Sequence, residues 1–398
     1  MKIVFISSLY PPEIMGGAEI VVKNIATELI KRGHEVIIIT TGRETKIEDL
    51  GNIKIYRLKL NLYFLLEFTS QHISKRLLWQ VVDLLNVEAY RKIRRILEAE
   101  SPDIVHMHNF KGLSPLSFKA VKDSGIPLVF TAHDYSPICL RSNLLNGKSE
   151  ICHGRNIACS SYNKIQKTII SDKADAVTAP SKFVLDKLES EGLFRDAEKI
   201  VLPNPIEGER KPCEKTYDVI DILFVGSLSK HKGPDILIKS FRKVEGDNLR
   251  LHIAGKGPME DEIRKLAKGD DRIIFHGFLT GDELESLYRM ANLTILPSIW
   301  YEAFGMVILE SFINSTPVIA SRIGGIPELV KDGYNGFLFE PGNSHELCIL
   351  IKKILNDPSI LSELETGAYE STSLYDIDMI IDQLLDIYRV YMEWSSSH

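Results

Sequence analysis

The sequence predicts an α/β protein of two tandem Rossmann-like domains, each a doubly wound parallel sheet, that face each other across a cleft. Short apolar runs rich in β-branched residues alternate with stretches whose apolar positions recur at helical spacing. This series occurs twice along the 398 residues. The strand-like runs are largely apolar rather than strictly alternating, which is typical of parallel strands buried on both faces.

The first series begins with a buried strand at residues 2–9 and a loop that ends in Gly-Gly. A helix is expected over 18–32, because its apolar residues fall on one helical face and Gly33 can end it. Further strands are predicted at residues 35–40, 103–108, 127–133, 176–181 and 199–204.

The second series repeats the alternation of strand and helix from Asp221 onward. One helix has proline in its first turn and another begins with a Thr/Asp start signal. Strands are predicted at 221–227, 250–257, 272–278, 293–298 and 316–321, helices at 234–244, 259–267, 280–291 and from about Phe304, and a loop at 322–328.

A proline-rich and then polar segment separates the two series. Residues 203–205 read Pro-Asn-Pro, and residues 207–218 are mostly polar. We therefore expect domains at 1–205 and 206–375, and a C-terminal helix at 376–398 that packs back toward the first domain. Ligands of such sheets bind beyond the carboxyl ends of the strands, which places the expected site in the cleft.

Composition is that of a globular protein rather than a membrane-spanning one. No run reaches the roughly 18 apolar residues that a membrane span needs. The apolar N-terminus is too short for a signal peptide, and with five cysteines a reducing cytoplasm is the expected location. The net charge of −6 divides into +5 over 1–205 and −11 over 206–398, so the first half suits an anionic partner or simply has a differently solvated surface. No nucleic-acid partner is expected.

Residues 60–100 interrupt the first series with apolar stretches and basic clusters at 75–76 and 91–95. The combination is consistent with a surface that touches lipid or a lipid-linked acceptor, and so with a protein peripheral to the inner face of a membrane. The alternative is core helices with solvated basic faces. We favour this alternative, because apolar helices in a chain of this size usually pack inward.

The stretch PSIWYEAFGMVILES, residues 297–311, contains two carboxylates around an expected helix start. If the stretch is mainly helical, Glu302 and Glu310 lie about 12 Å apart. That exceeds the roughly 5–9.5 Å of the carboxylate pair in a glycoside hydrolase. Amides near Gly305 would form an anion site between them. The order suits a nucleotide sugar, which presents a sugar, a diphosphate and a ribose.

Several other predicted strands are followed by residues that would suit the same ligand. Glycine permits close backbone approach, and lysine can neutralise a diphosphate. Each pattern alone is more often a turn or a structural histidine, but the shared position at strand ends favours a ligand site. These residues are Gly226, Ser227, Lys230 and Lys232 in the second half, and Gly16, Gly17 and His133 in the first.

Longer motifs carry a resemblance that covers nearly the whole chain. The most specific are EAFGMVILE, PVIASRIGGIPELV and GYNGFLFEPG; VGSLSKHKG, IAGKGP, FHGFL, LPNPI, GGAE and TAHDY accompany them. With its E-x7-E segment and downstream Gly-Gly-x-x-Glu pattern, the chain resembles the retaining glycosyltransferases of family four, which have the GT-B fold. One departure is Ser227, where the family often has arginine.

The resemblance implies transfer of a sugar from a nucleoside-diphosphate sugar to a sugar or lipid-linked glycan acceptor, in glycan or polysaccharide biosynthesis. Glu302 would bind donor-sugar hydroxyls, Glu310 the ribose, and Lys232 the leaving diphosphate. His133 would contact the donor sugar from the first, acceptor-binding domain. Other donor contacts would come from Phe304, Gly305 and Met306, from Gly226, Ser227 and Lys230, from Gly16 and Gly17, and from Phe278 beside the base.

The implied mechanism needs neither a covalent carboxylate nor a metal ion, since no Asp-x-Asp pattern lies in a suitable place. Two alternatives stay open: a hydrolysing nucleotide-sugar epimerase of the same shape, and a nucleotide-sugar-binding protein without turnover. An NAD enzyme is disfavoured, because neither first strand–helix loop contains G-x-G-x-x-G.

Three cysteines, Cys139, Cys152 and Cys159, lie in one loop-like region with His153. Three thiols and an imidazole can bind zinc. Their spacing lacks a Cys-x2-Cys pair, so three free thiols are the favoured interpretation.

Overall fold

The computed structural model describes residues 1–206 and 215–396, with side chains as far as Glu393. It divides into two compact units, which we call unit 1 and unit 2. Unit 1 comprises Met1–Asn143, His153–Pro205 and the segment from Ile377, and unit 2 comprises Leu144–Cys152 and Ile206–Asp376. Most of the polar boundary predicted at 207–218 lies outside the described residues.

Unit 1 is built on an eight-stranded sheet with the order β3-β4-β2-β1-β5-β6-β7-β8. Its pairs are parallel except β3–β4, which is antiparallel at the edge. The central strand β1 is buried on both faces, as its apolar run predicted. The strands are β1 (Lys2–Ser7), β2 (Glu35–Thr41), β3 (Lys46–Asp49), β4 (Ile53–Leu58), β5 (Ile104–Met107), β6 (Leu128–Thr131), β7 (Ala176–Ala179) and β8 (Glu198–Val201).

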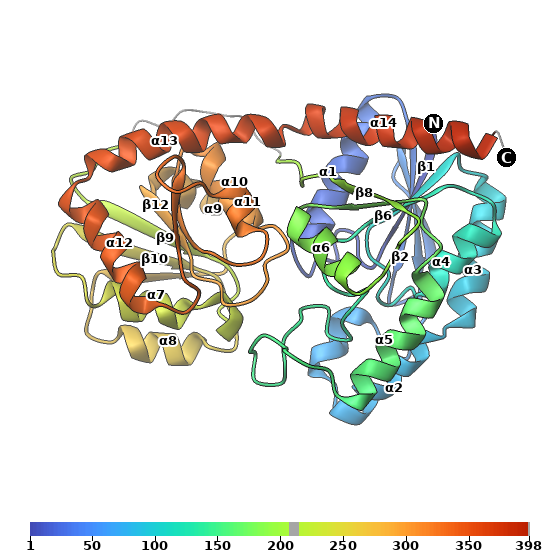
Figure 1. Ribbon diagram of the computed structural model, residues 1–398, viewed down its shortest axis with the longest axis horizontal. Helices are drawn as coiled ribbons and strands as arrows, with labels where there is room; N and C mark the ends of the chain where they lie inside the picture. Colours follow the sequence, from blue (N-terminus) through green and yellow to red (C-terminus); the bar gives the residue numbers. More distant parts are fainter. Residues whose placement is uncertain (207–214, 397–398) are drawn as a thin grey trace. The chain divides into compact units, whose positions relative to one another are not determined.

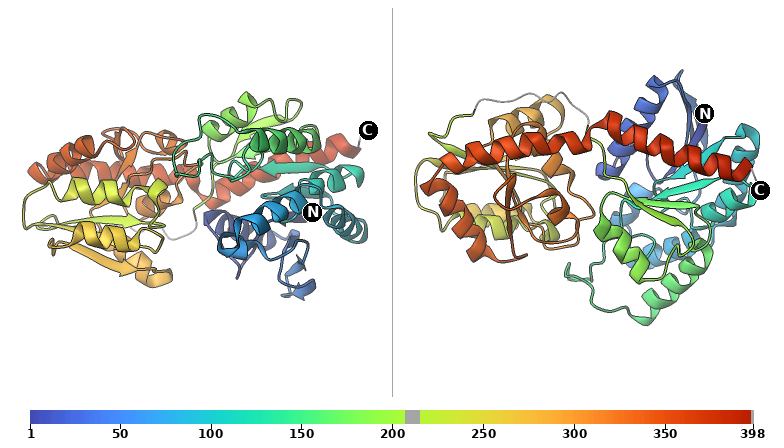
Figure 2. Two further views of the ribbon diagram at one scale, coloured as in Figure 1. Left: turned by 90° about the horizontal axis from the view of Figure 1, so that it is seen from below. Right: turned by 45° about the horizontal axis from the view of Figure 1, so that its top comes forward.

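Helices cover both faces of this sheet (Figure 1). They are α1 (Gly17–Lys31), η1 (Leu65–Ser70), α2 (Ile73–Leu84), α3 (Val87–Glu100), α4 (Leu116–Asp123), α5 (Ile157–Ile170), α6 (Lys182–Ser190) and α14 (Ile377–Ser396). Helix α14 lies beside α1 (Figure 2). Its Tyr388 is fully buried, and the hydroxyl lies 2.6 Å from Nδ1 of His106. Burial lowers the pKa of His106 to about 3, so this contact is one between neutral groups.

Unit 2 is built on a six-stranded, wholly parallel sheet with the order β11-β10-β9-β12-β13-β14. The strand order reverses between β9 and β12, which is the position where open parallel sheets bind ligands. The strands are β9 (Ile220–Val225), β10 (Leu249–Ala254), β11 (Ile273–Gly277), β12 (Leu293–Leu296), β13 (Val318–Ser321) and β14 (Gly336–Phe339).

The helices of unit 2 form a layer on each face of the sheet. Helices α7, α8 and α12 pack on one face, and α9 and α10 on the other. The elements are η2 (Lys230–Lys232), α7 (Pro234–Phe241), α8 (Glu260–Ala267), α9 (Gly281–Met290), α10 (Met306–Ile313), α11 (Ile326–Leu329), α12 (Ser344–Asn356), α13 (Ser359–Ser371) and η3 (Thr372–Tyr375).

The fold class predicted from the sequence is confirmed, with local corrections. No element was predicted at the positions of β3, β4, β14, α12 and α13, and the predicted loop at 322–328 runs into the short helix α11. Helix α3 buries Ile93 and Leu97, as a core helix should. The preferred interpretation of 60–100 is wrong for α2, which exposes most of its apolar residues. Within the described residues, no helix combines the length and apolar character needed to cross a bilayer.

Candidate functional site

Two loops of unit 2 pack together where β9 and β12 end, on either side of the strand-order reversal. One leads through η2 into α7, and the other leads through Pro297 into α10. Gly233 has φ +69°, and a Cβ there would lie 2.0 Å from the carbonyl oxygen of Pro297. The amide of Ile299 donates to the carbonyl of His231 at 2.8 Å. Glycine at 233 therefore lets η2 lie directly against the loop that carries Glu302.

Lys232, which is partly buried, and Glu302, which is buried, form an ion pair between these loops. Lys232 Nζ is 2.6 Å from Glu302 Oε1, and the hydroxyl of Ser298 donates to the same oxygen at 2.7 Å. The Lys232 ammonium also lies 5.2 Å from the ring centroid of Trp300. Burial alone would raise the pKa of Glu302, but the charge and hydrogen bonds of Lys232 and Ser298 hold it below its usual value. Glu302 is therefore a carboxylate that can only accept hydrogen bonds.

The Gly-Gly pair of the downstream motif holds the backbone of Glu302. The amide of Gly325 donates to the carbonyl of Glu302 at 2.8 Å. Gly324 has φ +63°, and a Cβ there would lie 2.3 Å from that same carbonyl oxygen. A side chain at 324 would thus displace the peptide that positions Glu302.

Helix α10 begins four residues after Glu302, at Met306, behind an unusual cap. Its N-cap is Gly305 with φ +111°, and no side chain caps the helix. The first amides of a helix have no partner within the helix, so this start is available to an anion. The structure corrects one premise of the sequence argument: the chain is helical only from Met306, so helical rise does not give the separation of Glu302 and Glu310. Phe304, just before the start, is buried in the core.

Glu310 lies on α10 and is held by a tyrosine that the sequence did not indicate. The hydroxyl of Tyr288, a buried residue of α9, donates to Glu310 Oε2 at 2.6 Å. Burial raises the pKa of Glu310, and the hydrogen bond from Tyr288 opposes that rise. A contact between neighbouring helices leaves no spacing pattern in the sequence, which is why Tyr288 was missed.

The remaining candidates of unit 2 are less closely gathered. Lys230 Nζ binds Asp235 Oδ2 at 2.9 Å, and Lys239 binds the same oxygen at 2.8 Å. Lys230 is therefore paired with a carboxylate other than Glu302. Ser227 is exposed at the end of β9, and Phe278 is 66% exposed just after β11.

Glycines at the ends of β9 and β10 have a packing role. The amide of Gly226 donates to the carbonyl of Ala254 at 3.0 Å. A Cβ at Gly255 would lie 1.9 Å from the carbonyl oxygen of Gly226, and one at Gly257 would lie 2.5 Å from that of Leu228. The IAGKGP motif is thus explained by the close approach of two backbones.

The candidate residues of unit 1 lie just after β6 and at the start of α1. His133 follows β6, and its Nε2 lies 3.0 Å from Nδ1 of His108. Burial lowers the pKa of His133 to about 4, so the ring is neutral. Its Nδ1 has no hydrogen-bond partner among the described residues. Gly16 and Gly17 are exposed at the start of α1, where the amide of Gly16 donates to Glu19 at 2.9 Å.

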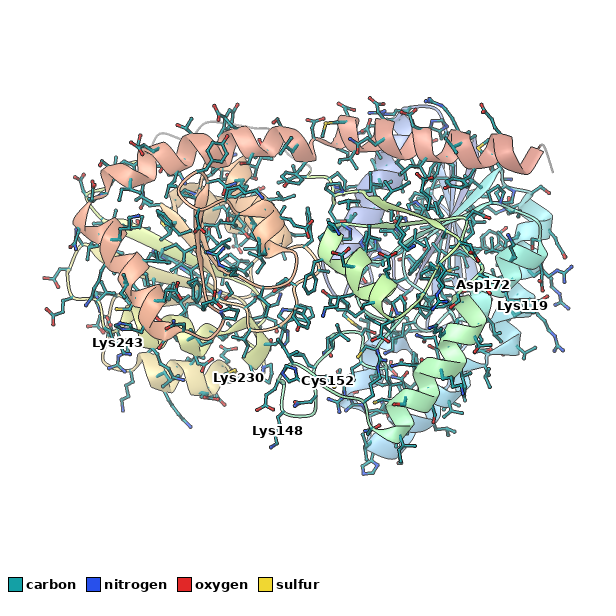
Figure 3. The ribbon with its side chains drawn as sticks, viewed as in Figure 1. Lys119, Lys148, Cys152, Asp172, Lys230 and Lys243 are labelled. Carbon is teal, nitrogen blue, oxygen red and sulfur yellow. The ribbon has the colours of Figure 1, made fainter. Side chains whose placement is uncertain are left out.

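Cys139, Cys152 and Cys159, all among the described residues, do not form a metal-binding group. Cys152 is exposed on the loop that also carries Lys148 (Figure 3), while Cys139 and Cys159 are partly buried. All three are free thiols. In the described part of the chain, no group of three or more His, Cys, Asp or Glu side chains is placed to hold a metal ion.

A separate cavity of about 270 Å³ lies in unit 1, where β2 and β4 end. Tyr63, Phe64 and Trp79 line it, together with the polar side chains of Arg43 and Asn61. Aromatic faces with a few polar groups are typical of small-molecule sites. This cavity could not be predicted from the sequence, because its lining comes from segments that are far apart in the chain.

Two protein families match the chain, one for each half. The family described as Glycosyltransferase Family 4 matches residues 15–210, and that described as Glycosyl transferases group 1 matches residues 206–371. An uncharacterized glycosyltransferase of Methanocaldococcus jannaschii is 28% identical, with 99% of each chain covered.

Solved structures share the fold at lower identity. Sucrose-phosphate synthase of Thermosynechococcus elongatus superimposes with a TM-score of 0.76 at 19% identity, covering 98% of each chain. Anabaena HepE in complex with UDP-glucose gives 0.73 at 19% identity, covering 98% of this chain and all of that one. Both halves match glycosyltransferase families, and the chain therefore belongs to the glycosyltransferases described as group 1 and Family 4.

Proposed function

We propose that this glycosyltransferase moves a sugar from a nucleoside-diphosphate sugar to an acceptor hydroxyl with retention of configuration, in glycan or polysaccharide biosynthesis. The observation that carries the proposal is the partly buried Lys232–Glu302 pair, whose glutamate lies four residues before the uncapped start of α10. A fixed cation, a fixed carboxylate and free helix amides suit a ligand with a diphosphate and sugar hydroxyls. HepE, with the same fold, binds UDP and UDP-glucose, which supports a donor of this class.

In the proposed mechanism, the site stabilises charge on the leaving group. Lys232 and the α10 amides face the diphosphate as its negative charge increases, and their fixed positions avoid reorganisation in the transition state. Glu302 accepts hydrogen bonds from the sugar hydroxyls. The acceptor oxygen attacks the anomeric carbon from the side that the diphosphate leaves, and its proton passes to the departing phosphate oxygen. Neutral His133 is assigned to the donor sugar.

Lys232 and the helix amides are proposed to supply the positive charge that a metal ion would otherwise supply. The acceptor is proposed to be a sugar or a lipid-linked glycan. The cavity of unit 1 suits one of its sugar rings, because Tyr63 offers an aromatic face and Asn61 offers hydrogen bonds.

The test is a screen of nucleotide sugars followed by analysis of the released sugar. We expect one nucleotide sugar to raise the melting temperature and the corresponding nucleoside diphosphate to do so as well. In the presence of EDTA, slow hydrolysis of the donor should release a sugar that keeps the donor's own anomeric configuration. Proton NMR measures the configuration of the released sugar. Release of the opposite anomer, of a 2-epimer, or dependence on added metal would contradict the proposal, as would binding without any turnover.

Replacing Glu310 with alanine is expected to weaken nucleoside diphosphate binding by about 10–100-fold, since a charged hydrogen-bond acceptor is lost. Turnover at saturating donor should change little, because the ribose lies far from the reacting bond.

Tyr288→Phe removes a hydrogen bond that opposes the raised pKa of Glu310. Its affinity should therefore fall at a higher pH than that of the wild type as the solution is acidified. Calorimetric titrations across pH measure both effects, and unchanged affinity in Glu310→Ala would remove the ribose assignment.

A further inference from the structure

Helix α2 turns its apolar side outward. Five apolar side chains of the helix and the residue after it are more than half exposed: Ile73 (57%), Leu77 (56%), Leu78 (55%), Val81 (61%) and Leu85 (54%). At about 100° per residue they fall within an arc of roughly 140°. A contiguous exposed apolar patch on a protein marks an interaction surface more often than isolated apolar residues do.

The orientation of α2 is fixed by its opposite side, which is buried and partly polar. Trp79 is fully buried, and its indole N–H donates to the carbonyl of Tyr63 at 3.0 Å. Asp83, also buried, accepts from the amide of Gly112 at 3.1 Å. Turning the helix to bury its apolar stripe would expose Trp79 and break both hydrogen bonds. The stripe therefore stays at the surface.

A neighbouring loop packs against the buried side of α2. The side chain of its Asn61 lies 3.5 Å from the carbonyl of Trp79 and 3.4 Å from Asp83. We call Ile73, Leu77, Leu78, Val81 and Leu85 the α2 face. Leu62 of the loop and Trp79 of the helix both line the cavity of unit 1, so that cavity lies next to α2.

The segment that contains α2 carries mainly positive charge. Over residues 59–95 there are seven lysines and arginines and three carboxylates, and two of the cations, Lys92 and Arg94, are paired with Glu88 and Glu98. Of these carboxylates, Asp83 is buried beneath the helix, Glu67 pairs with Arg43, and Glu88 pairs with Lys92. Lys75 is exposed at the edge of the stripe. An apolar face with a cationic border is complementary to the surface of a bilayer that contains anionic lipid.

We propose that the α2 face docks this protein onto an anionic membrane surface, with the helix lying in the interface. Apolar side chains would enter the boundary between headgroups and acyl chains, while Lys75 and its basic neighbours would contact phosphates. The cavity of unit 1 would then lie beside the headgroup layer. This inference goes beyond the transfer reaction, because docking needs neither a donor nor turnover.

The test is flotation with lipid vesicles. We expect the protein to float with vesicles of phosphatidylcholine and phosphatidylglycerol in roughly a 2:1 ratio, and to bind pure phosphatidylcholine about tenfold more weakly. The double variant Leu77→Ser, Val81→Ser should lose about tenfold in partitioning, since two side chains no longer enter the interface. Lys75→Glu should lower binding to anionic vesicles and leave binding to neutral ones nearly unchanged.

A matched control is provided by Ile349→Ser, Val390→Ser. These residues are also exposed on helices, at 52% and 56%, but lie outside the α2 face. This variant should float like the wild type, and equal melting temperatures would show that both variants fold. Failure of the wild type to float with anionic vesicles would overturn the proposal, as would equal flotation of the two double variants. A dimer that Leu77→Ser, Val81→Ser dissociates would assign the α2 face to a second copy of the chain instead.

Discussion

Replacing Lys232 with methionine is expected to lower kcat by about 10²–10³-fold and the free energy of unfolding by about 2–4 kcal/mol. The rate should fall because the ammonium that faces the leaving diphosphate is gone. The stability should fall because Glu302, 5% exposed, would keep its charge without its partner. Steady-state kinetics and urea denaturation measure the two effects.

The pH dependence of this variant's stability distinguishes the loss of the ion pair from a general loss of packing. In the wild type the folded-state pKa of Glu302 is lowered, so the pair stabilises the protein above the ordinary glutamate pKa and this contribution disappears as the pH falls. Without Lys232, burial is the dominant influence and the pKa of Glu302 should be raised. The variant then loses stability as the pH rises through that pKa. The stability difference between the two proteins should therefore shrink in acid.

Lys239→Met is the matched control for this prediction. Lys239 also pairs with a buried carboxylate, Asp235, but that carboxylate keeps Lys230 as a second partner. The control should lose less than about 1 kcal/mol and retain its turnover. Adding Glu302→Gln to Lys232→Met should restore much of the lost stability, because no uncompensated charge remains. A Lys232 variant with normal kcat would exclude the leaving-group assignment.

Gly324→Ala is expected to reduce kcat by about tenfold or more and to cost about 2–4 kcal/mol of stability. The left-handed backbone at φ +63° disfavours any side chain, and the new Cβ would lie 2.3 Å from the carbonyl oxygen of Glu302. Relief of that overlap must move the peptide that carries the sugar-binding carboxylate. The same kinetic and denaturation measurements apply.

Gly333→Ala is the control that distinguishes backbone strain from steric overlap with a neighbouring atom. Gly333 also has a left-handed backbone, with φ +75°, but a Cβ there would meet nothing within 4 Å. It should cost only about 1 kcal/mol and leave the activity intact. If both alanine variants lost the same activity and stability, the contact between Gly324 and Glu302 would not account for the loss.

Periodic patterns predicted the sheets, and contacts between distant segments escaped prediction. The runs that became β1, β9 and β12 are mostly apolar, so their burial could be inferred directly from the sequence. Strand β3 was missed because its residues Lys46–Asp49 are mostly polar and exposed at the edge of the sheet. Helix α2 was misassigned because apolar periodicity shows that a helix has an apolar side, but not which side its neighbours cover.

In the candidate site, too, individual residues could be chosen from the sequence, but the contacts between them could not be predicted. Glu302 and Lys232 could be chosen as candidates because glycine-containing motifs surround both of them. That they form a 2.6 Å pair, and that Lys230 is bound to Asp235 instead, depends on how two loops cross, 70 residues apart in sequence. The partnership of Tyr288 with Glu310 likewise depends on the packing of α9 against α10.

The burial of Tyr388 constrains the order of folding during synthesis. Because unit 1 includes α14, its structure is completed by residues that leave the ribosome after all of unit 2. When a nascent chain has been synthesised as far as Pro205, all the strands of the unit 1 sheet exist, but Tyr388, the partner of His106, has not yet been made. Unit 2 is nearly continuous in sequence, so it can reach its final state first, against the usual N-to-C order of domain folding.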